Sequence, residues 1–210
     1  MSYSSLFGIK KDYTGEILQE YHNSWLFSPI VWQVLPDKYI PYDIMTPYGF
    51  KKGIIGFDGN EVWTKTNNKI NNCDNMPDRI CWELSNQQIF FTKDKECVSD
   101  CIRRFVEQNK AYDKSKEDNM SPLEREHIIK RFNDIANDIL ALDENEHPYF
   151  VLKNTSVDDS VERWFYDYDE NDEHIDKSLK DWNEIVAEFV VIEDGKISSF
   201  INNLDYQYNT

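Results

Sequence analysis

The residues best suited to chemistry are carboxylates in the last third of the chain. Asp167, Asp169 and Asn171 have the D-x-D-x-N spacing with which a tight loop directs successive oxygen atoms at calcium. An EF-hand loop starting at Asp167 also needs a glycine at its sixth position and a bidentate glutamate at its twelfth, where this chain has Asp172 and Ser178. The mismatch favours a solvated acidic loop that attracts divalent ions diffusely, and we predict no specific metal site.

Other catalytic patterns are incomplete. Asp167 and Asp169 could instead serve a divalent-metal-dependent enzyme, for instance at a D-x-D sugar-nucleotide site, but no glycine-rich phosphate loop accompanies them. The 4 histidines are dispersed, without H-x-H or H-E-x-x-H spacing. Pro77-Asp78 could open a metal-dependent nuclease motif, yet no Glu-x-Lys follows at a suitable place. We therefore predict a protein that is not an enzyme and uses no cofactor, and we keep the metal-dependent enzyme as the alternative.

The 4 cysteines also form no recognisable site. Cys73, Cys81, Cys97 and Cys101 lack paired C-x-x-C spacing, which structural zinc normally uses, although Cys97 and Cys101 could supply half of such a site. The N-terminus has no basic region followed by an apolar stretch, and no run approaches the roughly 18 apolar residues of a membrane span. The sequence thus predicts a cytoplasmic protein whose reduced cysteines are buried as small hydrophobic groups.

Negative charge is concentrated toward the C-terminus. The formal charge of the chain is −16, of which residues 143–210 contribute −13 and residues 1–142 contribute −3. A field of this sign repels nucleic acid and anionic membranes and attracts basic proteins or cations. The same surface could simply keep the protein in solution. We expect no direct contact with nucleic acid or membrane.

The charge is densest in a segment that is also aromatic. From Thr155 to Asp176 there are nine acidic residues and a single base, interleaved with Trp, Phe and Tyr. Solvated acidic tails lack large apolar groups, so this mixture indicates a folded acidic surface. Tyrosine adds contact area for little loss of entropy. The predicted partner-binding residues are Asp158, Asp159, Glu162, Tyr166, Asp167, Tyr168, Asp169, Glu170, Asp172 and Glu173.

These features favour a non-catalytic acidic binding protein or inhibitor. Carboxylates held on a rigid surface can imitate the spaced phosphates of nucleic acid and so occupy a basic nucleic-acid groove. The predicted partner is a basic protein, either a nucleic-acid enzyme or a nuclease toxin. Two settings fit equally, a phage or mobile-element inhibitor such as an anti-restriction or anti-CRISPR protein, and a toxin immunity protein. A phage structural or assembly protein is a further alternative, although the long exposed edges or repeats typical of that class are missing from the sequence.

Apolar spacing, capping residues and turn residues predict the elements that must position these groups. The first elements are a helix over 14–25 (Ile17, Tyr21, Trp25) and a helix from Ser28 that Pro36 stops. They are followed by a strand over 54–57, a capping box at 58–61 that opens a helix with Val62, Thr66 and Ile70 on one face, and a loop over 67–75. The first half ends with a strand from Ile89 to Thr92 and a helix capped by Asp94, whose apolar positions run from Cys97 to Val106.

The second half is predicted in the same way. Its elements are a continuous helix over 122–142 behind the capping box Ser121-Pro122-Leu123-Glu124, a strand over 149–152, a short helix capped within 156–159, a helix containing Leu179, Trp182, Val186 and Phe189, and a hairpin with an Asp194-Gly195 turn.

The predicted fold class is α+β, with mixed helices and a small antiparallel sheet. We predict an aromatic-rich α+β part over residues 1–112 and an acidic helical part with a C-terminal hairpin over residues 121–210. The charged segment 111–120 between them has no apolar periodicity, so it is the predicted hinge, or else a linker within one compact domain.

Overall fold

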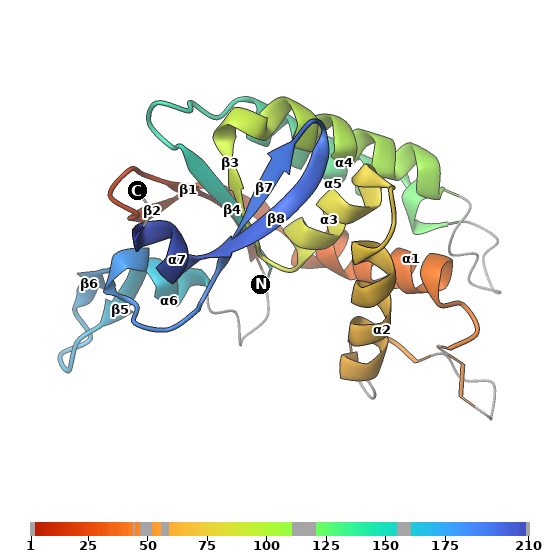
Figure 1. Ribbon diagram of the computed structural model, residues 1–210, viewed down its shortest axis with the longest axis horizontal. Coiled ribbons are helices and arrows are strands. Elements are labelled where there is room, and N and C mark those ends of the chain that lie inside the picture. The colour runs from red at the N-terminus through yellow and green to blue at the C-terminus, as the bar shows by residue number, and fades with distance from the viewer. Residues whose placement is uncertain are drawn as a thin grey trace.

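The computed structural model describes residues 3–43, 45–46, 52–55, 59–110, 121–154 and 161–208 of the chain (Figure 1). Its central feature is a six-stranded sheet with the strand order β2-β1-β4-β3-β7-β8, accompanied by a separate two-stranded sheet of β5 and β6. The strands are β1 (Tyr3–Ile9), β2 (Gly15–His22), β3 (Ile89–Phe91), β4 (Tyr149–Lys153), β5 (Tyr166–Tyr168), β6 (His174–Asp176), β7 (Glu188–Glu193) and β8 (Lys196–Asn202).

The predicted α+β class is confirmed. Neighbouring strands of the large sheet pair antiparallel, with the exception of β3 and β7, which run parallel through Ile89↔Phe189 and Phe90↔Val190. The sheet is therefore larger than expected and mixed. The parallel pair is possible because a long connection through helices and β4 separates β3 from β7 in the chain.

Seven helices flank the sheets in the described parts of the chain. They are α1 (Ser28–Tyr39), α2 (Gly59–Asn71), α3 (Met76–Ser85), α4 (Lys95–Asn109), α5 (Glu126–Leu140), α6 (Val161–Phe165) and α7 (Asn203–Tyr208), with short 3-10 turns at Ser24–Leu26, Thr92–Asp94, Pro122–Glu124 and Leu179–Asp181. None of the helices in these described segments is long and apolar enough to cross a membrane.

Both faces of the sheet are covered, because successive strand residues point to opposite sides. One core cluster joins α1–α5 to side chains on the first face, among them Leu6, Phe90, Phe150 and Val190. A second cluster joins α6 and the segment around Leu179 to the other face through Phe7, Ile89, Val151 and Phe189. Figure 1 shows α1–α5 on one side of the sheet and α6, α7 and the β5–β6 hairpin on the other.

Several local predictions are confirmed. α1 begins at Ser28 and Pro29, although its N-cap is Phe27 and the Ser28 hydroxyl donates to the Asn154 side chain instead. α4 follows Asp94, which forms no side-chain cap hydrogen bond, and Val98, Ile102 and Phe105 are buried. The strands at 89–91 and 149–153 form as expected. The turn between β7 and β8 places Asp194 and Gly195 at positive φ (49° and 71°), the type I′ geometry that an Asp-Gly pair favours.

The predicted helix over 14–25 is wrong, because this segment contains β2. Tyr21 is buried as expected, but Ile17 and Trp25 are 43% and 53% exposed, so the helical spacing of the three residues does not mark a buried stripe. β2 instead pairs antiparallel with β1 after a turn in which Tyr13 has a φ of 69°. Pairing with a strand already committed to the core outweighs a weak local helical pattern.

The predicted continuous helix over 122–142 is interrupted. The capping box at Ser121 and Glu124 forms, but it closes a 3-10 turn, and Arg125 is extended (ψ 123°) before α5 begins at Glu126. On one continuous helix Leu123 would lie about 140° around the axis from Ile128, at about 100° per residue. The break allows Leu123 to be fully buried in the same cluster as Ile128, Phe132, Ile135 and Ile139.

Four other segments differ from the predictions. The predicted helix containing Leu179 and Phe189 is a 3-10 turn followed by strand β7, since Phe189 pairs with Ile89 in the sheet. α2 runs through Asn71 into the predicted loop, because the fully buried Ile70 extends its apolar stripe. Similarly, α1 continues past Pro36 to Tyr39. A strand was predicted over 54–57, but residues 54 and 55 form a bend. Residues 56–58 lie outside the described residues, and they include the rest of this predicted strand and the start of the predicted capping box.

The two predicted parts of the chain contribute to one sheet. β1, β2 and β3 come from residues 1–112, and β4, β7 and β8 come from residues 121–210. The predicted hinge at 111–120 lies outside the described residues, so the boundary itself stays a prediction.

Candidate functional site

The acidic segment forms a hairpin that projects from the body of the protein. β5 follows α6 directly and pairs only with β6, through Tyr166↔Asp176, Asp167↔Ile175 and Tyr168↔His174. In Figure 1 this hairpin extends away from the large sheet at the end opposite α1–α5. A two-stranded ribbon on its own is marginal in water, so side-chain contacts must stabilise it.

Asp169 organises the turn of the hairpin. Its Oδ1 accepts hydrogen bonds from the backbone amides of Asn171 (2.7 Å) and Glu173 (2.8 Å), while its own amide donates to the Glu173 carbonyl (2.9 Å). The amides of Glu173 and Asn171 hold the pKa of Asp169 below its usual range. Asp172 has a φ of 62°, a conformation that aspartate and asparagine tolerate. The second aspartate of the D-x-D-x-N pattern is therefore a turn-forming residue.

Asp167 anchors the base of the hairpin. Its Oδ2 accepts a hydrogen bond from the Lys177 ammonium (2.6 Å), which lowers the pKa of Asp167. The same ammonium lies over the ring of Trp182, 5.4 Å from its centroid. The Lys177 amide donates to the Phe165 carbonyl (2.7 Å), so the strand leaving the hairpin is tied to the end of α6.

These contacts bear on the chemistry that Asp167 and Asp169 could perform. Both carboxylates already accept hydrogen bonds from within the hairpin, which explains their spacing without an ion. Among the described residues, no third ligand group lies close enough to the pair to complete a metal cluster. In the structure both carboxylates therefore shape the hairpin, and the metal-dependent enzyme at these two residues stays an alternative.

One face of the hairpin is aromatic. The ring of His174 stacks on Tyr166 with centroids 5.1 Å apart, and Tyr168 meets the same imidazole edge-on at 6.1 Å. Cross-strand pairs of this kind stabilise a ribbon. Tyr168 remains 60% exposed, and Ile175 on the opposite face is 45% exposed. The hairpin thus offers an aromatic and an aliphatic contact surface beside its charges.

The remaining carboxylates of the hairpin face solvent. Glu170, Asp172 and Glu173 are exposed at the tip, and Asp176 is exposed at the base. Residues 166–176 contain six acidic residues and no lysine or arginine. The hairpin is therefore a ribbon of one charge sign, with Lys177 just beyond its end as the neighbouring base.

The structure places the predicted site residues in three groups. Seven of the ten lie on the hairpin, between Tyr166 and Glu173. Glu162 lies on α6, where it forms an ion pair with Lys153. Asp158 and Asp159 lie outside the described residues.

The sequence analysis missed three residues of the hairpin, His174, Ile175 and Asp176. Strand β6, which contains them, is the pairing partner of β5. Tyr166-Asp167-Tyr168 alternates aromatic and acidic residues, as a two-faced strand does, and this alternation was the available signal.

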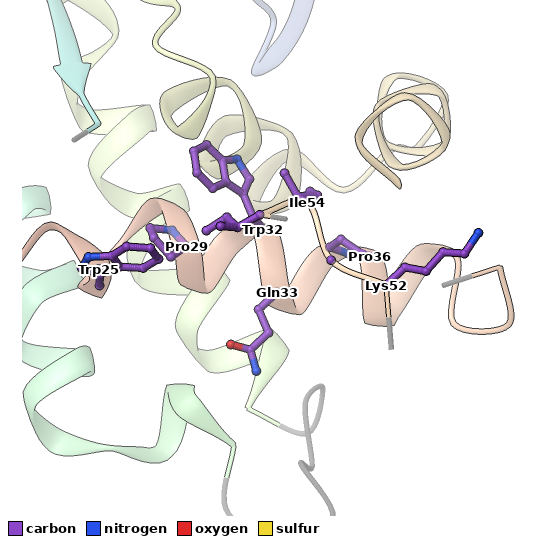
Figure 2. A pocket seen from close by; sticks show the side chains of 9 residues that line it. Trp25, Pro29, Trp32, Gln33, Pro36, Lys52 and Ile54 are labelled. Atoms are coloured by element: carbon purple, nitrogen blue, oxygen red, sulfur yellow. The ribbon is translucent and has the colours of Figure 1, made fainter. Parts of the chain in front are cut away.

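A second surface feature is a groove of about 370 Å³ beside α1. Figure 2 shows Trp25, Pro29, Trp32 and Pro36 following one another along the helix, with Ile54 beside Trp32 and Lys52 beside Pro36. Trp25 is 53% exposed. The groove has Lys52 at its rim, paired with Glu61 (3.1 Å), and no cluster of ionisable groups among its lining residues. Its described lining can hold an apolar group.

No protein-family model, no curated protein and no solved structure matches this chain.

Proposed function

We propose that this is a non-catalytic binding protein whose acidic hairpin, residues 166–176, occupies a basic, nucleic-acid-binding surface of a partner protein. The observation that supports it is the projecting ribbon with six carboxylates and no lysine or arginine. A basic groove that binds phosphates offers regularly spaced cations, and a ribbon of carboxylates complements them. Asp167 and Asp169 stabilise the shape of the ribbon, and the carboxylates at its tip supply the negative electrostatic potential that attracts the partner.

The hairpin also offers anchors for a stable complex. Charge complementarity mainly accelerates association, whereas buried aromatic contacts slow dissociation. Tyr168 and Ile175 are large, exposed side chains on opposite faces of the ribbon, so either face can pack against the wall of a groove. The ordered turn means that little conformational entropy is lost when the hairpin binds.

Two settings suit such a protein. One is inhibition of a host nucleic-acid enzyme by a phage or mobile element, as anti-restriction and anti-CRISPR proteins do. The other is neutralisation of a basic nuclease toxin by an immunity protein. Both require a carboxylate surface that reaches into a cationic groove, and neither requires this chain to touch nucleic acid or membrane. The partner's identity separates them.

Neutralising the tip should weaken attraction to the partner without unfolding the protein. In the triple variant Glu170→Gln/Asp172→Asn/Glu173→Gln, we expect association with the captured basic partner to slow about tenfold at low salt, because long-range steering depends on these charges. The salt dependence of association should flatten, because fewer charges remain to be screened. Stopped-flow or surface-plasmon measurement across a salt series gives both quantities.

The matched control removes the same charge elsewhere. Glu20, Glu144 and Glu193 are exposed and lie away from the hairpin, so Glu20→Gln/Glu144→Gln/Glu193→Gln changes the net charge equally. If the two triple variants associate alike, the hairpin is only part of a general acidic surface and the proposal fails. The competing enzyme hypothesis predicts that Asp169→Asn alone abolishes a measurable activity, whereas the binding hypothesis predicts that no single tip carboxylate is indispensable for partner capture.

A further inference from the structure

Three potential metal ligands meet at the edge of the large sheet, away from the acidic hairpin. Glu16 lies on β2, and Glu146 and His147 lie in the loop that precedes β4. One ligand atom from each of the three residues lies within 4.8 Å of the other two. They are brought together because β1 pairs with both β2 and β4.

His147 is held with its Nε2 directed at this cluster. The side chain is 5% exposed, and Nε2 lies 2.8 Å from Oε1 of Glu16. The imidazole packs on Gly8 of β1, where a Cβ atom would lie 2.5 Å from Cδ2 of the ring. The backbone is also fixed, since the His147 amide donates to the Asp143 carbonyl (2.8 Å) and its carbonyl accepts from the Thr92 hydroxyl (2.5 Å).

The two carboxylates complete the set of ligand atoms, and one of them is held in place whereas the other is exposed. Glu16 is already oriented, because its Oε2 accepts a hydrogen bond from the Lys10 ammonium (2.6 Å), which leaves Oε1 for the cluster. Ligating carboxylates are commonly held in this way by an outer partner. Glu146 is exposed and can adjust its position. Lys10 also brings a positive charge near the cluster, which limits the affinity for a cation.

We propose that Glu16, Glu146 and His147 form a surface site for a divalent transition-metal ion, with zinc as the representative. One imidazole nitrogen and two carboxylate oxygens are a donor set that zinc accepts, with water in the fourth position. Ligand bonds of about 2.0–2.2 Å at a tetrahedral angle separate two donor atoms by about 3.4 Å. The His147–Glu16 pair, at 2.8 Å, would therefore open by about 0.6 Å, and the exposed Glu146, whose ligand atom lies within 4.8 Å of the other two, would move closer. The ion would take the place of the hydrogen between Nε2 and Oε1, and the neutral imidazole bound through Nε2 would carry its hydrogen on Nδ1.

The bound ion would tie the β1–β2 hairpin to the loop before β4. This site is independent of the cysteines and of the proposed partner-binding hairpin. Since the ion binds only the folded arrangement of the three residues, it stabilises the protein in proportion to its occupancy.

Titration of the metal-free protein with zinc, followed by calorimetry, tests the site. We expect one saturable ion per chain and a rise in melting temperature. Glu146→Gln should weaken binding by at least the ~10-fold that loss of even an outer-sphere partner causes. The matched control Glu144→Gln removes the same charge two residues away in the same loop and should bind like the parent.

A direct signal from His147 completes the experiment. The imidazole Nε2 resonance should shift when zinc is added, and His147→Gln should lose both the shift and the high-affinity binding. If His147→Gln does not fold, Glu146→Gln remains decisive because its side chain is exposed. No saturable binding to the parent, or equal affinity in the Glu146→Gln and Glu144→Gln variants, would overturn the proposal.

Discussion

Replacing Asp78 with alanine is expected to lower the free energy of unfolding by about 3–5 kcal/mol, the cost of breaking a buried ion pair from one side. Asp78 lies on α3 and is fully buried. Its Oδ2 accepts hydrogen bonds from the Lys38 ammonium and the Tyr39 hydroxyl, each at 2.6 Å, and its Oδ1 accepts from the Asn109 amide at 2.8 Å. This one carboxylate therefore connects α1, α3 and α4.

The loss arises because three donors lose a shared charged acceptor in a buried network. The Lys38 side chain is 15% exposed, and its ammonium loses the counter-charge of Asp78 while it keeps the Asn109 side-chain oxygen at 2.8 Å. Replacing Lys38 with methionine in the same chain should recover part of the stability, because an uncharged side chain needs no counter-charge. Urea unfolding of the single and double variants measures this coupling.

Asp74→Ala is the matched control, since Asp74 is exposed just before the same helix. It should change the free energy of unfolding by no more than about 0.5 kcal/mol. Equal stability of the Asp74 and Asp78 variants would show that the buried network contributes nothing. The Asp78 variant should still bind the partner through the hairpin wherever it remains folded, since none of the network residues lies on residues 166–176.

The network also explains Pro77-Asp78, which resembles the opening of a nuclease motif. Pro77 occupies the first turn of α3, and the Asn75 side chain accepts the Asp78 amide hydrogen (3.3 Å). The aspartate side chain then turns inward to Lys38 instead of toward solvent. Sequence alone shows a proline and an acid at a helix start, but the partners come from segments about 30–40 positions away, as the hydrogen bonds show.

Predictions based on local signals succeeded where the local signal and the core agreed. The capping box at Ser121 and Glu124, the Asp-Gly turn and the apolar stripes of α2 and α4 all describe interactions within one element. These depend on residues three or four positions apart, which a reader of the sequence can inspect directly.

The failures occurred where a distant strand decided the structure. Phe189 has helical spacing from Leu179, yet it becomes a strand residue because it packs beside β3, through Ile89. Tyr21 likewise has helical spacing from Ile17, yet its segment pairs with β1 and forms a strand of the sheet. Periodicity cannot reveal such pairings, since the partner lies far along the chain and the energy comes from burying both strands together.

The candidate site was predictable in composition but not in shape. Charge and aromatic content located the segment, whereas the roles of its carboxylates depended on the hairpin. Asp169 bonds to backbone amides and Asp167 to Lys177, so two apparent ligands are structural. The cluster of Glu16, Glu146 and His147 was invisible to sequence analysis because sheet pairing creates it.

The stability of the protein is expected to decrease as the pH rises from about 4.5 to 8, through one buried acid, Glu83. This side chain on α3 is 4% exposed, and burial raises the pKa of Glu83 to about 8. Arg79 opposes the rise in the pKa, and Glu188 adds to it. In the unfolded chain the same carboxyl titrates near its ordinary value of about 4.3. Between these two values the folded state binds more protons than the unfolded state.

The sign of the effect follows from that proton balance. Stability falls with pH wherever the folded state holds the additional proton, at up to about 1.4 kcal/mol per pH unit for one group. The favourable contribution of the neutral acid is therefore complete below pH 4 and is lost as the pH rises through 8. Integrated over this window, the loss amounts to roughly 4 kcal/mol. Glu83→Gln keeps the shape of the neutral acid and has no proton to lose.

We therefore expect Glu83→Gln to match the parent near pH 4 and to exceed its stability by several kcal/mol at pH 8. Urea unfolding of both proteins at intervals from pH 4 to 8 measures the difference, with other titrating groups cancelling between them. Glu96→Gln on α4 is the control, because Glu96 is exposed and its replacement should shift the curve by a small constant amount. If the difference in free energy of unfolding between Glu83→Gln and the parent does not change from pH 4 to 8, Glu83 is already ionised in the folded protein. In that case Arg79 would have to supply the compensating charge, and Arg79→Met would then be as destabilising as breaking a buried ion pair.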